Sequence, residues 1–265
     1  MIHYIWILFL KIPFLWGGFM EKQVSGITIN YQFFSNDSDT LVVFLHGWGQ
    51  NISMMEPVEK FYRSFFNTLI LDLPGFGKSE EPKRVWTVYD YADFIHDFVS
   101  SFSISKLIFV GHSFGGKISL VYASKYQLEK LVCFGSPYCK ELTKLPFKNR
   151  VYKQMKKIPF LKIFTKMMQS HVGSVDYRNA SEKMRGVLVS TVNTEIIEDV
   201  KKIKCPTLLV WGSLDTAVPI SRAYELEQMI PDSGVVEFEG ATHYAYLERI
   251  HEVIRVLDSF FGCRR

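Results

Sequence analysis

One serine of this chain lies in a sequence whose spacing is typical of an enzymatic nucleophile. The GHSFG sequence at 111–115 fits the pattern GxSxG and stands between the apolar run 107–110 and a stretch of helical pattern. A sharp strand-to-helix turn of this kind exposes the serine hydroxyl, and its glycines relieve crowding against neighbouring elements. The helix behind the turn supplies backbone N–H groups and the positive end of its dipole. The sequence therefore predicts that Ser113 is a nucleophile.

A serine hydroxyl needs a base to react at neutral pH, and the base needs a carboxylate that orients it. After such a turn, the acid and the histidine follow the serine in that order, at the ends of later strands. Asp215 lies just beyond the apolar run 207–211, and His243 lies just beyond the run 235–238. Since an open parallel sheet builds its site at the carboxyl ends of its strands, we expect Ser113, Asp215 and His243 to form a catalytic triad.

Both supporting residues have a structural alternative. Asp215 would then cap the helix that follows it, and His243 would be a structural histidine. Their competitors are less well placed, because Asp199 and Asp232 do not follow a buried strand. The remaining histidines lie in the N-terminal leader, in helical patterns, in an insert or beside other strand ends; they are His3, His46, His96, His112, His171 and His251.

An oxyanion-binding turn is predicted after the apolar run 41–45, where the sequence reads HGWG. In this arrangement one backbone N–H comes from that turn and the other from the residue after the nucleophile. We therefore expect the N–H groups of Trp48 and Phe114 to bind the oxyanion, each contributing about 3–4 kcal/mol in the tetrahedral state. Gly47 and Gly49 allow the turn, although they also suit a tight turn without a catalytic role.

The elements that position these residues alternate along the chain. Short apolar runs at 41–45, 68–71, 107–110, 131–134, 207–211 and 235–238 are typical of strands buried on both faces of a parallel sheet. A strand-like pattern over 24–34, with a turn at Gly26, precedes them, and helical patterns cover about 52–65, 88–102, 115–125, 221–230 and 247–261. Alternation of this kind predicts an α/β fold with a doubly wound, mostly parallel sheet. The chain has 265 residues, 48% of them hydrophobic and 22% charged, as a globular protein with a sizeable core would have.

A long segment interrupts the alternation between the fourth and fifth buried runs. We expect residues 137–205 to form a helical cap, and residues 21–136 and 206–265 to form the core. Over 137–204 the chain carries 15 Lys and Arg but 6 Asp and Glu, a net charge of +9, so the rest of the chain has a net charge of −5.

The first 20 residues are almost wholly apolar and aromatic, but Lys11 and Pro13 interrupt them. This segment is too short for a spanning helix and lacks a convincing signal-peptide cleavage site. Three interpretations remain open for this apolar leader: an N-terminal anchor, a poorly formed signal, or a segment outside the fold that precedes the true start of translation at Met20. The last is favoured, because the sequence from Met20 onward reads as an ordinary strand. A cytoplasmic location is expected, with membrane association if segment 1–20 is real and retained.

Two further patterns argue against a cofactor or metal. The DLPGFGKS sequence at 72–79 ends like a phosphate-binding loop but lacks the earlier glycine at the required spacing. We expect it to be a turn that shapes the site, ordered by Asp72. The four cysteines have neither CxxC spacing nor matching histidines, so neither a zinc site nor a disulfide framework is expected; they are Cys133, Cys139, Cys205 and Cys263.

Taken in order, HGWG, DLPGFGKS, GHSFGG, WGSLDTAVP and GATHYAYLE resemble the α/β-hydrolase superfamily over nearly all of 24–261 except the insert. The resemblance implies a Ser-His-Asp hydrolase of esters, thioesters, amides or activated C–C bonds, with the insert as a lid that filters substrates. Ser113 departs from the dehalogenase and epoxide-hydrolase branches, which have aspartate at this position. HGWG followed by Gln50 and Asn51 is also similar to carboxylesterases that act on pimeloyl-carrier-protein methyl esters.

The leading hypothesis is a serine hydrolase that cleaves a carboxylic ester through an acyl-enzyme, in class EC 3.1.1. An acyltransferase, an amidase or a C–C bond hydrolase would use the same triad, and a non-catalytic small-molecule receptor would use the same fold. The insert places lysines between apolar residues over 148–168. This pattern suits a lid with a solvated lysine face, or a surface that recruits an acidic carrier protein or an anionic membrane. No nucleic-acid motif accompanies the charge.

Overall fold

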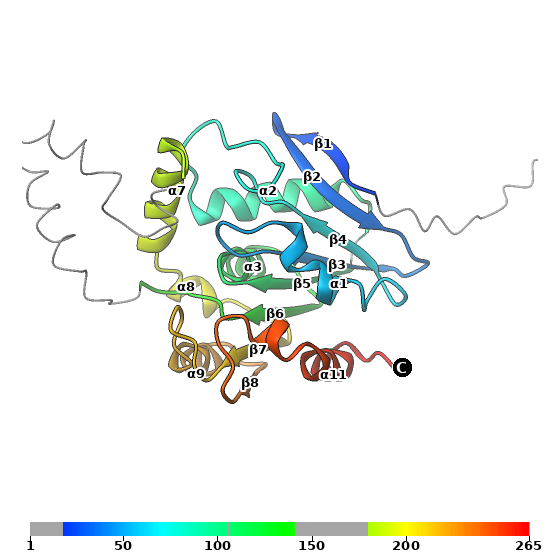
Figure 1. The fold of residues 1–265 in the computed structure, drawn as a ribbon, viewed down its shortest axis with the longest axis vertical. Helices are drawn as coiled ribbons and strands as arrows, with labels where there is room; N and C mark the ends of the chain where they lie inside the picture. Colours follow the sequence, from blue (N-terminus) through cyan, green and yellow to red (C-terminus); the bar gives the residue numbers. More distant parts are fainter. Residues whose placement is uncertain (1–17, 105, 141–179, 265) are drawn as a thin grey trace, which may run out of the picture.

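The computed structural model describes residues 18–104, 106–140 and 180–264. Within them one sheet has eight strands in the order β1-β2-β4-β3-β5-β6-β7-β8 (Figure 1). β2 is antiparallel to β1 and β4, and all other neighbours are parallel. The strands are β1 Met20–Val24, β2 Ile27–Phe34, β3 Thr40–Leu45, β4 Asn67–Leu71, β5 Lys106–His112, β6 Lys130–Phe134, β7 Thr207–Gly212 and β8 Ser233–Phe238. The predicted α/β class with a mostly parallel sheet is confirmed.

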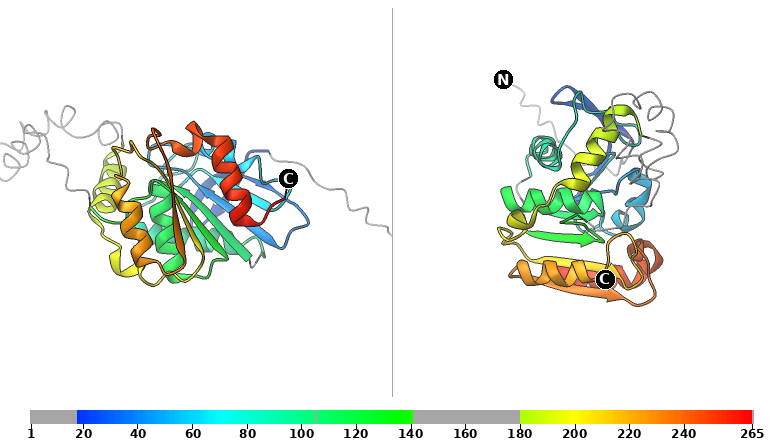
Figure 2. Two further views of the ribbon diagram at one scale, coloured as in Figure 1. Left: turned by 90° about the horizontal axis from the view of Figure 1, so that it is seen from below. Right: turned by 90° about the vertical axis from the view of Figure 1, so that its left-hand side faces the viewer.

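Helices cover both faces of the sheet (Figure 2). Alternate residues of the central strands enter separate cores: Leu41, Val43 and Leu45 of β3 face one, and Val42 and Phe44 face the other. The first core also includes residues of α2 Val88–Ser100, α3 Phe114–Lys125 and α9 Ser221–Met229, and the second includes α1 Glu56–Glu59 and α11 Ile250–Phe261. Burial on both faces explains why these strands are continuous apolar runs.

Three predicted elements differ in extent from those of the structure. The predicted strand over 24–34 is the shorter β2, and β1 lies before it and pairs with it in a hairpin that turns at Ser25 and Gly26. The predicted helix over 52–65 is wrong in length: only η1 Ile52–Met54 and α1 are helical. There the buried carboxylate of Glu59 binds Arg63 and Thr68, which curls the chain back toward β4. At the C-terminal end, α10 Ala245–Glu248 and α11 are separate helices that meet at Arg249.

The predicted cap lies partly within the described residues. Residues 180–205 contain α7 Glu182–Asn193 and α8 Ile197–Val200, whereas 141–179, with most of the basic sequence, lie outside the described residues. The buried side chain of Lys117, on α3, donates to the carbonyl oxygens of Thr191 at 2.8 Å and Thr194 at 2.6 Å. Since these carbonyls lie at the C-terminal end of α7, Lys117 fixes that end of α7 to α3.

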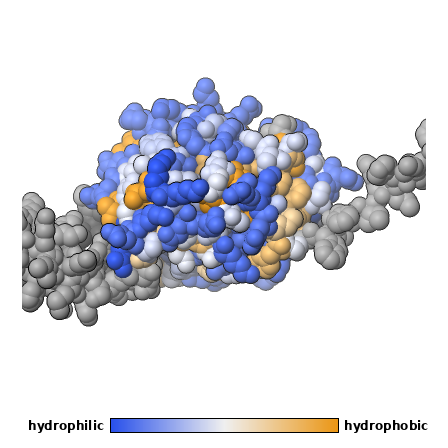
Figure 3. Space-filling view, turned by 90° about the horizontal axis from the view of Figure 1, so that it is seen from above, coloured by the Kyte–Doolittle hydropathy of each residue, from blue (hydrophilic) through white to orange (hydrophobic). Residues whose placement is uncertain are grey.

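The outer surface is mixed in character. On the face in Figure 3, hydrophilic side chains predominate and hydrophobic ones gather in separate patches. No helix among the described residues is long and apolar enough to cross a membrane. Of the predicted leader over 1–20, residues 1–17 lie outside the described residues. Met20 begins β1, so the leader's predicted boundary is one residue too long.

Candidate active site

The predicted site residues gather at the carboxyl edge of the parallel strands. Trp48 lies in the turn after β3, and Ser113 follows β5 directly. Asp215 lies in the loop after β7, and His243 lies in the loop after β8. Because these strands run parallel in one sheet, their four loops emerge at the same edge.

Ser113 occupies a strained turn between β5 and α3. Its φ of 51° and ψ of −111° are unusual for a residue with a side chain, and such a conformation costs about 1–3 kcal/mol. The turn is compact because an added Cβ on Gly115 would lie 2.3 Å from the carbonyl oxygen of Leu45. The Ser113 N–H donates to the Phe134 carbonyl at 2.8 Å, which anchors the turn to the end of β6. The GxSxG pattern thus forms the predicted strand-to-helix elbow.

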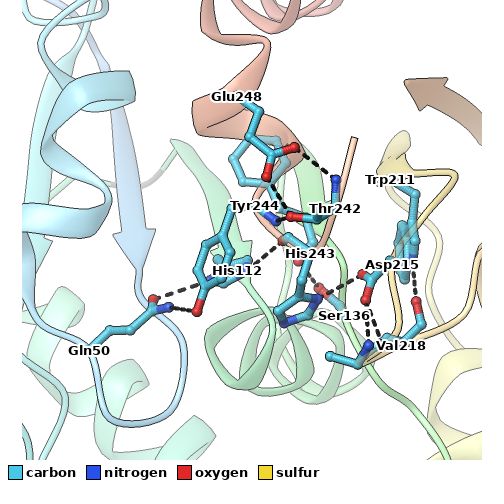
Figure 4. Close-up of polar contacts among 12 residues, drawn as sticks. Gln50, His112, Ser136, Trp211, Asp215, Val218, Thr242, His243, Tyr244 and Glu248 are labelled. Atoms are coloured by element: carbon cyan, nitrogen blue, oxygen red, sulfur yellow. Dashed lines mark hydrogen bonds and ion pairs between the residues drawn. The ribbon is translucent and has the colours of Figure 1, made fainter. Parts of the chain in front are cut away.

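Asp215 and His243 are directly hydrogen-bonded. The Nδ1 atom of His243 lies 2.7 Å from Oδ2 of Asp215, whose side chain is fully buried (Figure 4). Oδ1 of Asp215 accepts the N–H groups of Ala217 and Val218, each at 2.8 Å. Asp215 therefore does not cap α9, whose N-cap is Ile220. Since a carboxylate only accepts, Nδ1 of His243 carries the proton that bonds Asp215.

Gly135 lies against this pair, just after β6. Its φ is +51°, and an added Cβ would lie 2.9 Å from Nδ1 of His243 and 3.1 Å from Oδ2 of Asp215. The Gly135 N–H donates to the Val210 carbonyl of β7, and the carbonyl of the preceding residue, Phe134, accepts the Ser113 N–H. The Asp215–His243 pair and the Ser113 turn therefore flank the same short segment.

The side chains of the two predicted oxyanion residues pack together. Phe114 is the first residue of α3, where a backbone N–H has no partner within the helix. The ring of Trp48 packs against the rings of Phe114 and Phe76, with centroids 5.3 Å and 4.8 Å apart. The turn after β3 therefore reaches the start of α3, as a shared anion site at these N–H groups would require.

Buried polar contacts hold the loops that carry Trp48 and Phe76. Nδ1 of His46 donates to the Gly47 carbonyl at 2.7 Å, and Nε2 accepts the Leu73 N–H at 2.9 Å. Burial lowers the pKa of His46 to about 4, so its ring is neutral and fits these two bonds. Asp72 accepts the N–H groups of Ile52 and Lys78, each at 2.8 Å. The expectation that Asp72 orders this turn is confirmed.

A cavity of about 270 Å³ lies beside the Trp48 turn. Trp48 and Phe76 form an aromatic wall, and Met184 of α7 adds an apolar contact from the cap. Glu81 is the charged residue of the lining, and it accepts a hydrogen bond from Ser181 at 3.0 Å. The cavity therefore offers both polar and apolar surface next to Trp48, one of the two predicted oxyanion residues.

Known proteins share both the sequence pattern and the architecture. Residues 40–141 match the family model described as the alpha/beta hydrolase fold. The chain is 25% identical over 245 residues to AB hydrolase superfamily protein YisY of Bacillus subtilis (strain 168), covering 83% of this chain and 90% of that protein. The chain belongs to the α/β-hydrolase superfamily. This α/β hydrolase is also 26% identical over 254 residues to the monoacylglycerol lipase ABHD6 of Rattus norvegicus, covering 83% of this chain and 75% of that protein.

Solved structures of the superfamily agree in fold. The enol-lactonase from Burkholderia xenovorans LB400 superposes with a TM-score of 0.73 at 18% identity, and the match covers 92% of this chain and 100% of that chain. A thermophilic esterase from Thermogutta terrifontis gives a TM-score of 0.67 at 19% identity, covering 92% of this chain and 97% of that chain. These two enzymes share the fold of this chain, and its sequence relatives include a monoacylglycerol lipase.

Sequence reasoning missed three residues that shape this site. Gly135 carries no motif, and its role follows only from its closeness to His243 and Asp215. Gln50 and His112 lie within recognised sequences, but their joint contact depends on the packing of three loops. The sequence carries no signal that singles out Gln50, because polar His46 and Asn51 lie in the same turn.

Proposed function

We propose that this α/β hydrolase cleaves carboxylic esters, in class EC 3.1.1, with Ser113, His243 and Asp215 as its catalytic triad. The observation that carries the proposal is the 2.7 Å bond between His243 and Asp215 beside the strained Ser113 turn. A histidine held by a buried carboxylate, together with a serine on a sharp turn, is the arrangement that nucleophilic acyl transfer needs.

The reaction would proceed in two displacements. Ser113 Oγ attacks the ester carbonyl carbon while Nε2 of His243 takes the hydroxyl proton, and Asp215 stabilises the imidazolium. The N–H groups of Trp48 and Phe114 bind the negative oxygen of the tetrahedral intermediate. Collapse breaks the ester C–O bond, and His243 returns the proton to the leaving alcohol. Water then attacks the acyl-enzyme by the same route, which yields the carboxylic acid and free Ser113.

The relatives and the cavity support an ester of modest size. Curated relatives include a monoacylglycerol lipase, whose reaction is the hydrolysis of an ester. A cavity of about 270 Å³ with an aromatic wall suits a short acyl or alcohol group, since ligand cavities of about 300 Å³ and more enclose drug-sized molecules.

Turnover of p-nitrophenyl esters of increasing acyl length tests this proposal. We expect wild-type hydrolysis that is fastest for short chains, and a loss of at least about 10³-fold in kcat for Ser113→Ala. The matched control is Ser136→Ala, which changes a buried serine after β6. Equal turnover by wild type and Ser113→Ala would exclude the triad, and transfer to an added alcohol in place of hydrolysis would redefine the protein as an acyltransferase.

A further inference from the structure

His112, the residue before the nucleophile, bridges two loops of the site. Its side chain is fully buried, with Nε2 3.1 Å from the backbone carbonyl oxygen of His243 and Nδ1 3.2 Å from Oε1 of Gln50 (Figure 4). Its ring also lies against the rings of His243 and Tyr244, with centroids 4.8 Å and 5.3 Å away. The mechanism described above does not use this histidine.

Gln50 extends the bridge to the turn that carries Trp48. Oε1 of Gln50 accepts the Gly47 N–H at 2.9 Å, and Nε2 of Gln50 donates to the Tyr244 hydroxyl at 3.3 Å. The same side chain therefore contacts the turn after β3, the loop after β8 and His112 at the end of β5. These are the elements on which the predicted oxyanion donor, base and nucleophile lie.

The hydrogen-bonding capacity of these atoms decides where the His112 proton lies. A backbone carbonyl only accepts, and among the described residues His112 is the only donor to the His243 carbonyl. The Gln50 oxygen already has the Gly47 N–H as a donor. Burial lowers the pKa of His112 to about 3, so the ring is neutral and carries one proton. The proton therefore belongs on Nε2, where it bonds the main chain of His243, and Nδ1 of His112 contacts Oε1 of Gln50 without a hydrogen bond.

We propose that His112 and Gln50 are positioning residues for the base His243. The His112 Nε2–H group holds the His243 main chain, and Gln50 fixes that loop relative to the turn after β3. Nδ1 of His243 is already held by Asp215, so a second contact at its main chain defines where Nε2 points. This inference rests on the proposed function, because it concerns the geometry of the same triad.

Two substitutions at His112 separate positioning from packing. The amide nitrogen of Gln in His112→Gln lies near the place of Nε2, so it can still donate to the His243 carbonyl. The shorter side chain in His112→Asn reaches only the place of Nδ1 and loses that bond. We expect His112→Asn to lower kcat about 10- to 100-fold with KM unchanged, the effect of one lost hydrogen bond that acts in the transition state. We expect His112→Gln to recover most of that loss.

Equal losses in both variants, or a loss confined to KM, would overturn the positioning role, since a packing defect does not depend on where the donor lies. Thermal unfolding accompanies the kinetics. If His112→Asn does not fold, Gln50→Met replaces it, because Gln50 is partly exposed. It should lower kcat about 3- to 10-fold at constant KM, and an unchanged kcat would overturn the inference. Ser113→Ala separates the two proposals: if it is inactive while His112→Asn is fully active, only the positioning role fails.

Discussion

Replacement of Asp215 by asparagine tests whether His243 is held in the tautomer that a base requires. Asparagine has the shape of aspartate but replaces one oxygen by an NH₂ group. In the wild type, Oδ1 accepts two backbone N–H groups at 2.8 Å each, and Oδ2 faces Nδ1 of His243 at 2.7 Å. The two N–H donors would keep the amide oxygen of Asp215→Asn on their side, so the NH₂ group must point at His243.

This orientation reverses the hydrogen bond to the histidine. Nδ1 of His243 would accept, the ring proton would move to Nε2, and Nε2 could no longer take the proton of Ser113. The same replacement in serine proteases lowers kcat about 10⁴-fold, equivalent to about 5 kcal/mol in the activation barrier. Both backbone bonds survive, so the free energy of unfolding should fall by no more than about 1 kcal/mol.

The assay combines hydrolysis of p-nitrophenyl acetate with thermal unfolding. The matched control is Asp199→Asn on α8, where the carboxylate binds Tyr89 at 2.6 Å and Lys202 at 2.9 Å outside the site. We expect Asp199→Asn to keep wild-type kcat and Asp215→Asn to lose almost all of it at a similar Tm. A folded Asp215→Asn protein within about tenfold of wild-type kcat would refute the tautomer argument.

Three further predictions concern residues around the site. Gly135→Ala should lower kcat of ester hydrolysis about 10²-fold by displacing the His243–Asp215 pair, because its Cβ would lie 2.9 Å from Nδ1 of His243; wild-type kinetics would contradict this. Burial lowers the pKa of Lys117 in the folded protein to about 8 from 10.5, so the unfolded chain binds this proton more tightly than the folded protein does. The stability of wild type relative to Lys117→Met, measured by urea unfolding, should therefore rise by up to about 3 kcal/mol between pH 8 and 10.5; a flat difference would count against the buried ammonium. Burial also lowers the pKa of His46 to about 4 from 6.5, so wild type should lose up to about 3 kcal/mol relative to His46→Gln as the pH falls from 6.5 to 4; equal acid sensitivity of the two proteins would argue against a neutral ring.

The sequence predicted the parallel strands well because each is buried on both faces. Short, continuous apolar runs such as 41–45 and 207–211 are typical of buried strands. All six predicted runs are strands in the structure. Ser113, Asp215 and His243 could then be placed, because motifs at strand ends inherit the geometry of the sheet. The 52–65 segment could not be placed, because it forms one 3₁₀ turn and one short helix followed by turns, and Glu59 bonds Thr68 of β4, a contact that no local pattern reports.

Contacts between loops were beyond sequence reasoning. Nothing in the pattern around Gly135 indicates that His243 passes within van der Waals distance, and the bond from His112 to the His243 carbonyl joins residues 131 positions apart. Such contacts depend on how three loops pack at the sheet edge, and no periodicity reports that packing. The burial of Lys117 is similar, since its acceptors lie on the separate helix α7 and just beyond it.

The central claim, that Ser113 is an activated nucleophile, is tested most directly by covalent labelling. The full-length protein is treated with a fluorophosphonate probe, and the modified peptide is identified by mass spectrometry. We predict a single phosphonyl group on Ser113, no label on Ser113→Ala, and much slower labelling of Asp215→Asn. Labelling of Ser113→Ala at the wild-type rate, or attachment of the probe to another serine, would contradict this account.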